Sequence, residues 1–171
     1  MANGKVLVVM GSDSDFPVME GCFKMLNKFG VEFEADVASA HRTPERAHEL
    51  AATAEEKGFK VIIAAAGGAA HLPGVIAAST VLPVIGVPIK TTMGMEAWDS
   101  MLSIIQMPPG IPVATVGVNA AQNAAILATQ ILAVADPEIR EKVAAKKASL
   151  ADKITKANEE LKKVKFDYKT N

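Results

Sequence analysis

The sequence is poor in cysteine, in aromatic residues and in net charge. Its single cysteine, Cys22, excludes an intrachain disulfide, and with only three histidines (His41, His48 and His71) no spacing typical of a zinc site arises. Aromatic residues make up 5% of the 171 residues, so the core must be built from Ala, Val, Ile, Leu and Met. A formal net charge of −1 gives the chain no electrostatic attraction to nucleic acid or to anionic lipid.

Long hydrophobic runs are also absent. The first apolar run, Val6–Met10, is too short for a signal peptide and meets a glycine at once. No segment reaches membrane-spanning length without polar interruption. We therefore expect a soluble, cytoplasmic protein with no metal and with no nucleic-acid or membrane partner. The length suits one domain with a full core.

Short apolar runs alternate with helical patterns through residues 5–135. The predicted strands span residues 5–10, 31–38, 60–65, 82–87 and 111–115, and the predicted helices span residues 16–29, 44–57, 71–80, 95–106 and 119–135. This alternation predicts an α/β fold, a three-layer αβα sandwich whose parallel sheet is covered by helices on both faces. Because the first strand is the most apolar, we place it centrally in a flavodoxin-like five-stranded sheet of order 2-1-3-4-5.

Three loops follow the first three predicted strands. They are Gly11–Asp15, Ser39–Thr43 and Ala66–His71. In a flavodoxin-like sheet, ligands bind outside the carboxyl ends of the strands, at the switch between strands 1 and 3. The three loops should therefore converge on one binding site.

The second loop combines a proton-transfer group with a fixed cation. Thr43 is a good N-cap and Pro44 suits the first helical position. His41 and Arg42 therefore lie just before a helix, where backbone N–H groups favour anions. Arginine offers phosphate a rigid charged fork, and histidine gives and takes protons near neutral pH. The alternative is an exposed loop with two ordinary polar residues.

The first loop suits a phosphorylated ribose. Gly11 lets the backbone approach a ligand closely, and Ser12 with the helix N-terminus can bind phosphate oxygens. Asp15 is the candidate for ribose hydroxyls, although Ser14 or Asp15 could instead only cap the helix. The glycine spacing fits neither a Walker loop nor a dinucleotide fingerprint.

The third loop, Ala66–His71, is small-residue backbone against which a flat ring could lie. His71 begins the next helix, either as a capping or pocket-wall imidazole or in a direct chemical role. The rigid segment 106–112 could also wall a pocket. From the residues alone, we expect a protein that binds a small phosphorylated ribose compound and has one histidine fit for proton transfer, but no reaction follows.

The end of the chain differs from the rest. After Asp136 and Pro137 a charged helix should run to about Lys165. Its apolar positions form a narrow stripe with steps of seven, four and three residues, which is typical of a heptad seam: Val143, Leu150, Ile154, Ala157, Leu161 and Val164. We expect residues 136–171 to pack as a helical extension on neighbouring subunits, beside a catalytic domain of residues 1–135. The alternative is a helix folded back on its own domain.

Four ordered segments resemble the motifs of the N5-carboxyaminoimidazole ribonucleotide mutases, the class I enzymes of purine biosynthesis. They span residues 11–15, 39–44, 66–74 and 106–113, within a resemblance that covers residues 4–135. The resemblance implies conversion of N5-carboxyaminoimidazole ribonucleotide to 4-carboxy-5-aminoimidazole ribonucleotide. It also implies that no cofactor is needed, and that the chain forms a homo-octamer with sites near subunit contacts.

The resemblance also implies a role for each matching residue. His41 matches the general acid and base, and the ribose-phosphate contacts match Ser12, Asp15 and Arg42. The loops around the base and the carboxylate match Ser39, Gly67, Gly68, Ala70, His71 and Leu72. Two alternatives remain: a class II aminoimidazole ribonucleotide carboxylase that uses free carbon dioxide, and a non-catalytic flavodoxin-like nucleotide-binding module. The segment 106–113 favours class I.

Overall fold

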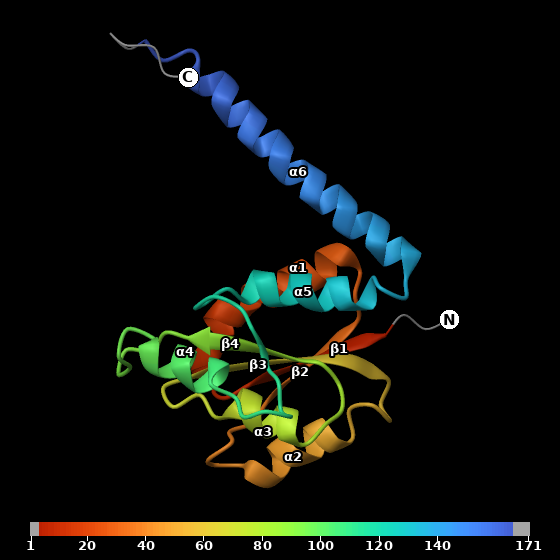
Figure 1. Cartoon of the computed structure of the whole chain (residues 1–171), viewed down its shortest axis with the longest axis vertical. Helices are drawn as coiled ribbons and strands as arrows, with labels where there is room; N and C mark the ends of the chain where they lie inside the picture. Colours follow the sequence, from red (N-terminus) through yellow and green to blue (C-terminus); the bar gives the residue numbers. More distant parts are fainter. Residues whose placement is uncertain (1–3, 166–171) are drawn as a thin grey trace.

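Five parallel strands form one sheet in the order β2-β1-β3-β4-β5, as predicted. The computed structural model describes residues 4–165 (Figure 1). The strands are β1 (Lys5–Met10), β2 (Phe33–Val37), β3 (Phe59–Gly67), β4 (Val84–Ile89) and β5 (Ala114–Thr115). β1 pairs with β2 on one side and β3 on the other, so the order reverses at β1 and the switch point lies there.

Helices cover both faces of the sheet, which confirms the three-layer αβα sandwich (Figure 1). One face carries α1 (Phe16–Phe29) and α5 (Ala121–Leu132). The other face carries α2 (Pro44–Ala52), α3 (Leu72–Ala78) and α4 (Trp98–Ile105). A 3-10 turn, η1 (Asp13–Asp15), precedes α1, and the long helix α6 (Pro137–Leu161) is the last helix among the described residues.

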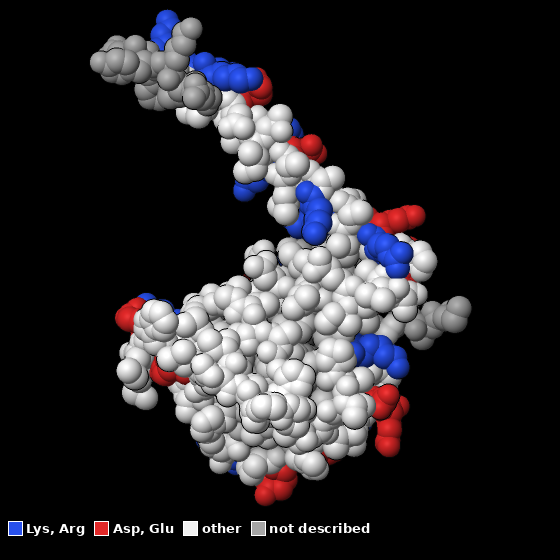
Figure 2. Space-filling model, viewed as in Figure 1, with Lys and Arg blue, Asp and Glu red and all other residues white. Residues whose placement is uncertain are grey.

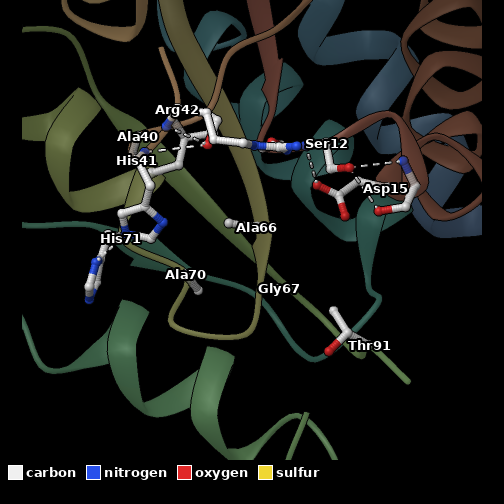
Figure 3. A pocket seen from close by; sticks show the side chains of 14 residues that line it. Ser12, Asp15, Ala40, His41, Arg42, Ala66, Gly67, Ala70, His71 and Thr91 are labelled. Carbon is white, nitrogen blue, oxygen red and sulfur yellow. Dashed lines mark hydrogen bonds between the residues drawn. The ribbon is translucent and has the colours of Figure 1, made fainter. Parts of the chain in front are cut away.

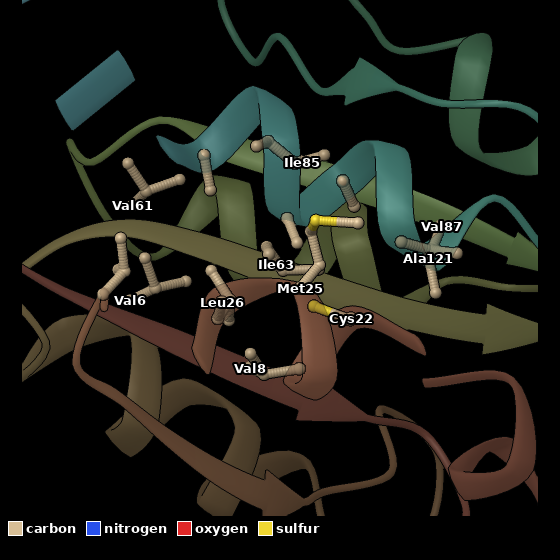
Figure 4. Packing of buried hydrophobic residues seen from close by; sticks show 14 of the residues in the cluster. Val6, Val8, Cys22, Met25, Leu26, Val61, Ile63, Ile85, Val87 and Ala121 are labelled. Carbon is tan, nitrogen blue, oxygen red and sulfur yellow. The ribbon is translucent and has the colours of Figure 1, made fainter. Parts of the chain in front are cut away.

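The central strands are apolar throughout because both of their faces are buried. In β1, Val6 and Val8 pack toward α1 and α5, whereas Leu7 and Val9 pack toward α2 and α3. Figure 4 shows the first of these layers, in which side chains of the sheet meet Cys22, Met25 and Leu26 of α1. Cys22 is fully buried, and burial raises the pKa of its thiol to about 12, so Cys22 is a packing residue.

Most predicted boundaries were wrong by one to five residues, and three of the differences have a clear local reason. α2 ends at Ala52, five residues before the predicted end at residue 57. The chain turns after Ala52, which buries Ala54, and Gly58 then adopts a left-handed conformation. β3 continues two residues further than predicted, because its ladder with β4 runs to the pair Gly67–Ile89. β5 has two residues instead of five, and its predicted first half contains Pro112, which has no N–H for the ladder.

α6 leaves the domain instead of folding back on it (Figure 1). Asp136 caps its start by accepting the Ile139 N–H at 3.1 Å. Ile139 is the one buried residue of α6, and Val143 packs against the same core. The rest of the helix does not touch that core, and residues 166–171 of the predicted extension lie outside the described residues. Within residues 4–165, no helix is long and apolar enough to cross a membrane.

Candidate active site

The loops after β1, β2 and β3 converge on one cavity of about 290 Å³ at the carboxyl edge of the sheet (Figure 3). Every predicted site residue except Gly68 lines it: Ser12, Asp15, Ser39, His41, Arg42, Gly67, Ala70, His71 and Leu72. Five further residues complete the lining: Gly11, Ser14, Ala40, Ala66 and Thr91. The convergence follows from the parallel topology, because the carboxyl ends of neighbouring strands meet at the same edge.

The first loop is closed by a capping box. The Ser12 N–H donates to Asp15 Oδ2 at 3.1 Å, and the Ser12 hydroxyl accepts from the Ser14 N–H at 3.3 Å. Asp15 is 3% exposed, and burial raises the pKa of its carboxyl. The Asp15 side chain therefore caps the η1 turn, which was one of the two roles expected for it. The N-cap of this turn is Ser12, and not Ser14. Of the two carboxylate oxygens of Asp15, only Oδ2 accepts a hydrogen bond from the described residues.

The second loop is organised by the Ser39 hydroxyl, which corrects two expectations. This hydroxyl accepts from the N–H groups of His41 at 3.3 Å and Arg42 at 3.2 Å, so these N–H groups do not point outward toward an anion. Thr43 occupies the N-cap position, but its hydroxyl accepts from the Ser39 N–H at 2.9 Å instead of capping α2. Pro44 does begin the helix. The loop is thus a self-bonded turn that presents the side chains of His41 and Arg42.

Arg42 reaches from the second loop to the first. Its Nη2 donates to the Gly11 carbonyl at 3.4 Å, which brings the guanidinium beside Ser12 (Figure 3). Among the described residues that line the cavity, Arg42 is the only lysine or arginine. A phosphate that enters the cavity therefore meets its fixed positive charge at this end.

The two cavity histidines form a pair. His41 Nε2 lies 2.7 Å from His71 Nδ1, with the rings edge-on at 81°. One of the two nitrogens must carry the proton in this contact. His41 follows β2 and His71 follows β3, and β1 lies between these two strands. The two strands are therefore about 10 Å apart, so only long side chains from their loops can meet. The contact joins a proton donor directly to a proton acceptor inside the cavity.

Small residues form the floor of the cavity. A Cβ at Gly67 would come within 2.2 Å of Thr91 Cγ2 and 3.1 Å of the Ile89 carbonyl, so a larger residue there would displace the Thr91 side chain and crowd the end of β4. Ala70 adopts a left-handed φ of 44°, which is unfavourable for a residue with a side chain. Gly68, at φ 60°, makes the turn but does not line the cavity, which corrects its predicted place.

Two further placements differ from the sequence-based expectation. Thr91 follows β4 and lines the cavity, although the sequence analysis gave it no role. The rule that ligands bind at the carboxyl ends of parallel strands would have predicted this position, as it did for the loops after β1, β2 and β3. The segment 106–112 does not line the cavity; Met107 packs instead beside Gly74 of α3.

The fold and the site define a flavodoxin-like α/β protein with a ligand cavity at the switch between β1 and β3. The cavity places a fixed cation at one end and a histidine pair at the other. The family model described as AIR carboxylase matches residues 5–153, and the chain belongs to this family.

The relatives agree with the resemblance that the four motifs indicated. The chain is 63% identical to the N5-carboxyaminoimidazole ribonucleotide mutase of Pyrococcus abyssi, over 81% of this chain and 79% of the relative. It is 49% identical to the protein of the same name from Thermotoga maritima, over 95% of this chain and 94% of the relative. The crystal structure of Treponema denticola PurE is 30% identical, with a TM-score of 0.82 over 94% of this chain and 99% of that one.

Proposed function

We propose that the chain converts N5-carboxyaminoimidazole ribonucleotide to 4-carboxy-5-aminoimidazole ribonucleotide in de novo purine biosynthesis. The observation that carries the proposal is the His41–His71 contact of 2.7 Å in the same cavity as Arg42. This arrangement offers one molecule both a proton shuttle and an anchor for its phosphate. The names of the two mutase relatives agree with it.

The cavity suggests how the ribonucleotide binds. Its phosphate meets the Arg42 guanidinium and the Ser12 loop, because these supply the charge and the donors at one end. The ribose hydroxyls donate to the Asp15 carboxylate, whose position the capping box fixes. The imidazole ring lies on the flat backbone of Gly67, which places its reacting edge toward His41.

The chemistry needs one group that acts first as an acid and then as a base. His41 donates a proton to the exocyclic nitrogen, the N–C bond breaks, and carbon dioxide leaves. Ring carbon 4 of the neutral aminoimidazole then attacks the trapped carbon dioxide, and His41 accepts the proton from that carbon. His71 holds His41 in place and bonds to its Nε2 between the two steps. The carbamate is already activated, so the reaction requires neither ATP nor biotin.

The walls of the cavity suit a trapped gas. Ala66, Ala70 and Leu72 are buried and apolar, and they line the cavity beside the histidine pair. Carbon dioxide held against such a wall is kept away from water, which would otherwise hydrate it. We therefore place the migrating carboxyl group between these residues and His41.

A substrate competition tests the proposed function. The protein is offered the carbamate ribonucleotide in one assay and aminoimidazole ribonucleotide with bicarbonate in another, and formation of the 4-carboxy product is measured. We expect product from the carbamate at low bicarbonate. Product from the second mixture alone would establish a class II carboxylase instead. Binding of nucleotide or flavin without turnover of either substrate would leave a non-catalytic module.

Arg42→Ala should mainly weaken binding. A charge-assisted hydrogen bond contributes about 1.5–3 kcal/mol, so the KM for the ribonucleotide should rise about 10- to 150-fold. The turnover number should change less, because the phosphate is remote from the reacting bond. The measurement compares the ribonucleotide with its dephosphorylated ribonucleoside in both proteins. The variant should lose most of the preference for the phosphorylated form.

Arg46→Ala is the matched control for this prediction. Arg46 lies on α2, pairs with Asp36 and Glu49, and does not line the cavity. Its loss should leave the KM and the preference for phosphate unchanged. If Arg42→Ala still discriminates between the two compounds as strongly as the parent does, Arg42 is not the phosphate anchor.

A further inference from the structure

The loop between β4 and α4 joins two anchored ends. At the end of β4, Asn119 Oδ1 accepts the Lys90 N–H at 3.0 Å. At the start of α4, the buried Ser100 hydroxyl donates to the Ile89 carbonyl at 3.1 Å. The Lys90 ammonium also pairs with the Glu96 carboxylate, and Figure 2 shows basic and acidic side chains together at the edge of the domain where α4 lies. Any movement of the loop is therefore confined to the residues between these anchors.

The backbone of this loop is strained. Glu96 and Ala97 adopt left-handed φ values of 53° and 71°, although neither residue is glycine. Residues in this conformation persist only where the surrounding structure requires it, and they cluster at ligand-binding and switch segments. The strain points to a role for the loop beyond the connection of β4 to α4.

A buried carboxylate oxygen inside the loop lacks a partner. Asp99 Oδ1 is buried and accepts no hydrogen bond from the described residues. A Cβ at Gly94 would lie 2.8 Å from Thr91 Oγ1, 3.0 Å from Asp99 Oδ2 and 3.3 Å from Asp99 Oδ1. The Thr91 hydroxyl and the Asp99 carboxylate therefore lie against the same glycine. An unpaired buried carboxylate oxygen is unfavourable, and the Thr91 hydroxyl is a donor in the same loop.

Thr91 closes the end of the cavity that lies farthest from β2. The strand order places Thr91 and the His41 loop on opposite sides of β1 and β3, and Figure 3 shows them on opposite sides of the cavity. Of the lining residues within 4–165, Thr91 is the only one that follows β4. Its methyl group lies over Gly67, on the floor where the proposed ring rests. Thr91 is thus the side chain through which the strained loop reaches the cavity.

We propose that Asp99 is a positioning residue for Thr91 and that Thr91 contacts the ligand. Asp99 Oδ1 accepts the proton of the Thr91 hydroxyl when the strained loop closes on a bound ribonucleotide. A hydroxyl whose proton is held by a carboxylate offers only its lone pairs to other groups, so Thr91 accepts a hydrogen bond from the ligand. This inference rests on the proposed function, because it takes the ribonucleotide as the ligand.

The charge of Asp99 favours one orientation of the ribonucleotide. A carboxylate behind Thr91 disfavours an anionic group at this end of the cavity, whereas Arg42 favours one at the other end. The phosphate is thus directed to Arg42, and a hydrogen-bond donor is directed to Thr91. The ribonucleotide carries such donors on its ribose hydroxyls and on its exocyclic nitrogen.

A double-mutant cycle tests whether Asp99 acts through Thr91. Thr91→Val keeps the shape of the side chain without its hydroxyl, and Asp99→Asn places an amide that can donate as well as accept, so it no longer fixes the hydroxyl. Each change should weaken the binding of aminoimidazole ribonucleotide, measured by calorimetry, about 2- to 12-fold, the loss expected for one hydrogen bond. The double variant should bind no more weakly than Thr91→Val alone. Thr91→Ser keeps the hydroxyl and should lose less affinity than Thr91→Val.

Thr92→Val is the matched control. Thr92 is the next residue, is exposed and does not line the cavity, so its change should leave the affinity at the parental value. Circular dichroism should show all variants folded. Parental affinity in Thr91→Val would overturn the contact with the ligand. If Asp99→Asn weakens binding as much in the Thr91→Val background as in the parent, Asp99 acts on the fold and not through Thr91, and its positioning role is overturned.

Analogues of the ribonucleotide identify the donor that Thr91 receives. Imidazole ribonucleotide lacks the exocyclic nitrogen, and the 2′-deoxy and 3′-deoxy forms each lack one hydroxyl. The effect of Thr91→Val on affinity should disappear with the analogue that lacks the bound donor. An equal loss with all three analogues would overturn the proposal. Because affinity is measured, a parent that binds the ribonucleotide without turning over the carbamate refutes the proposed function alone, and a parent that does not bind it refutes both.

Discussion

His41→Asn should lower the turnover number by about two to four orders of magnitude, the loss expected when general acid–base catalysis is removed. Asparagine keeps a similar shape and still reaches toward His71, but it cannot pick up a proton. The proposed phosphate and ribose contacts lie on the first loop and Arg42, so the affinity for the product should stay within a few-fold of the parental value. Single-turnover kinetics with the carbamate substrate, and titration of the product by calorimetry, separate the two effects.

His48→Asn is the control for this variant. His48 lies on α2, its Nδ1 is 3.0 Å from the Ser79 hydroxyl, and it does not line the cavity. Its loss should leave turnover at the parental level. Near-normal turnover by His41→Asn would remove His41 from the mechanism, and His71 would then be the remaining histidine in the cavity.

The sheet and its loops could be predicted because their signals are local. Val6–Met10 is apolar at every position, which a strand shows only when both of its faces are buried, so a central parallel strand followed. Once the strand order was inferred, the rule that ligands bind at the switch point placed Ser12, Arg42 and Ala70 at one edge. The structure puts all three around the same cavity.

The details of the site depend on contacts that no local pattern records. Whether the Ser39 hydroxyl bonds to its own loop or to a ligand depends on a turn conformation, and both uses suit the same residue. The His41–His71 contact joins residues 30 positions apart, and it requires rotamers that reach across β1. Thr91 was missed because the fourth strand was given no role, although its carboxyl end lies at the same edge.

The limits of the fold prediction have the same origin. The pattern of α2 continues helically to Lys57, but the core selects a turn that buries Ala54. The stripe on α6 indicated a partner outside the domain. Val143 packs on its own domain instead, and the members from Leu150 onward remain exposed. A stripe predicts that something covers it, but it does not say which surface does so.

Removal of residues 137–171 should break the assembly without unfolding the domain. We propose that the chain forms a homo-octamer held in part by α6, so a chain that ends at Asp136 should show a smaller mass by light scattering. Only Ile139 and Val143 of α6 pack on the domain core, and burial of one such side chain contributes about 1.5–3 kcal/mol. The truncated domain should therefore keep its α/β circular dichroism with a lowered melting temperature. Turnover should fall as well, because the family resemblance implies sites that lie near subunit contacts.

A second truncation separates the two roles of α6. A chain that ends at Lys147 keeps Ile139 and Val143 on the domain core but lacks Leu150, Ile154 and Leu161. It should melt at a higher temperature than the chain that ends at Asp136, because it keeps the contacts with the domain core, and yet have the same smaller mass and lower turnover. If both truncated chains stay octameric and fully active, α6 beyond Val143 is a solvated appendage and the subunits are held together by other surfaces.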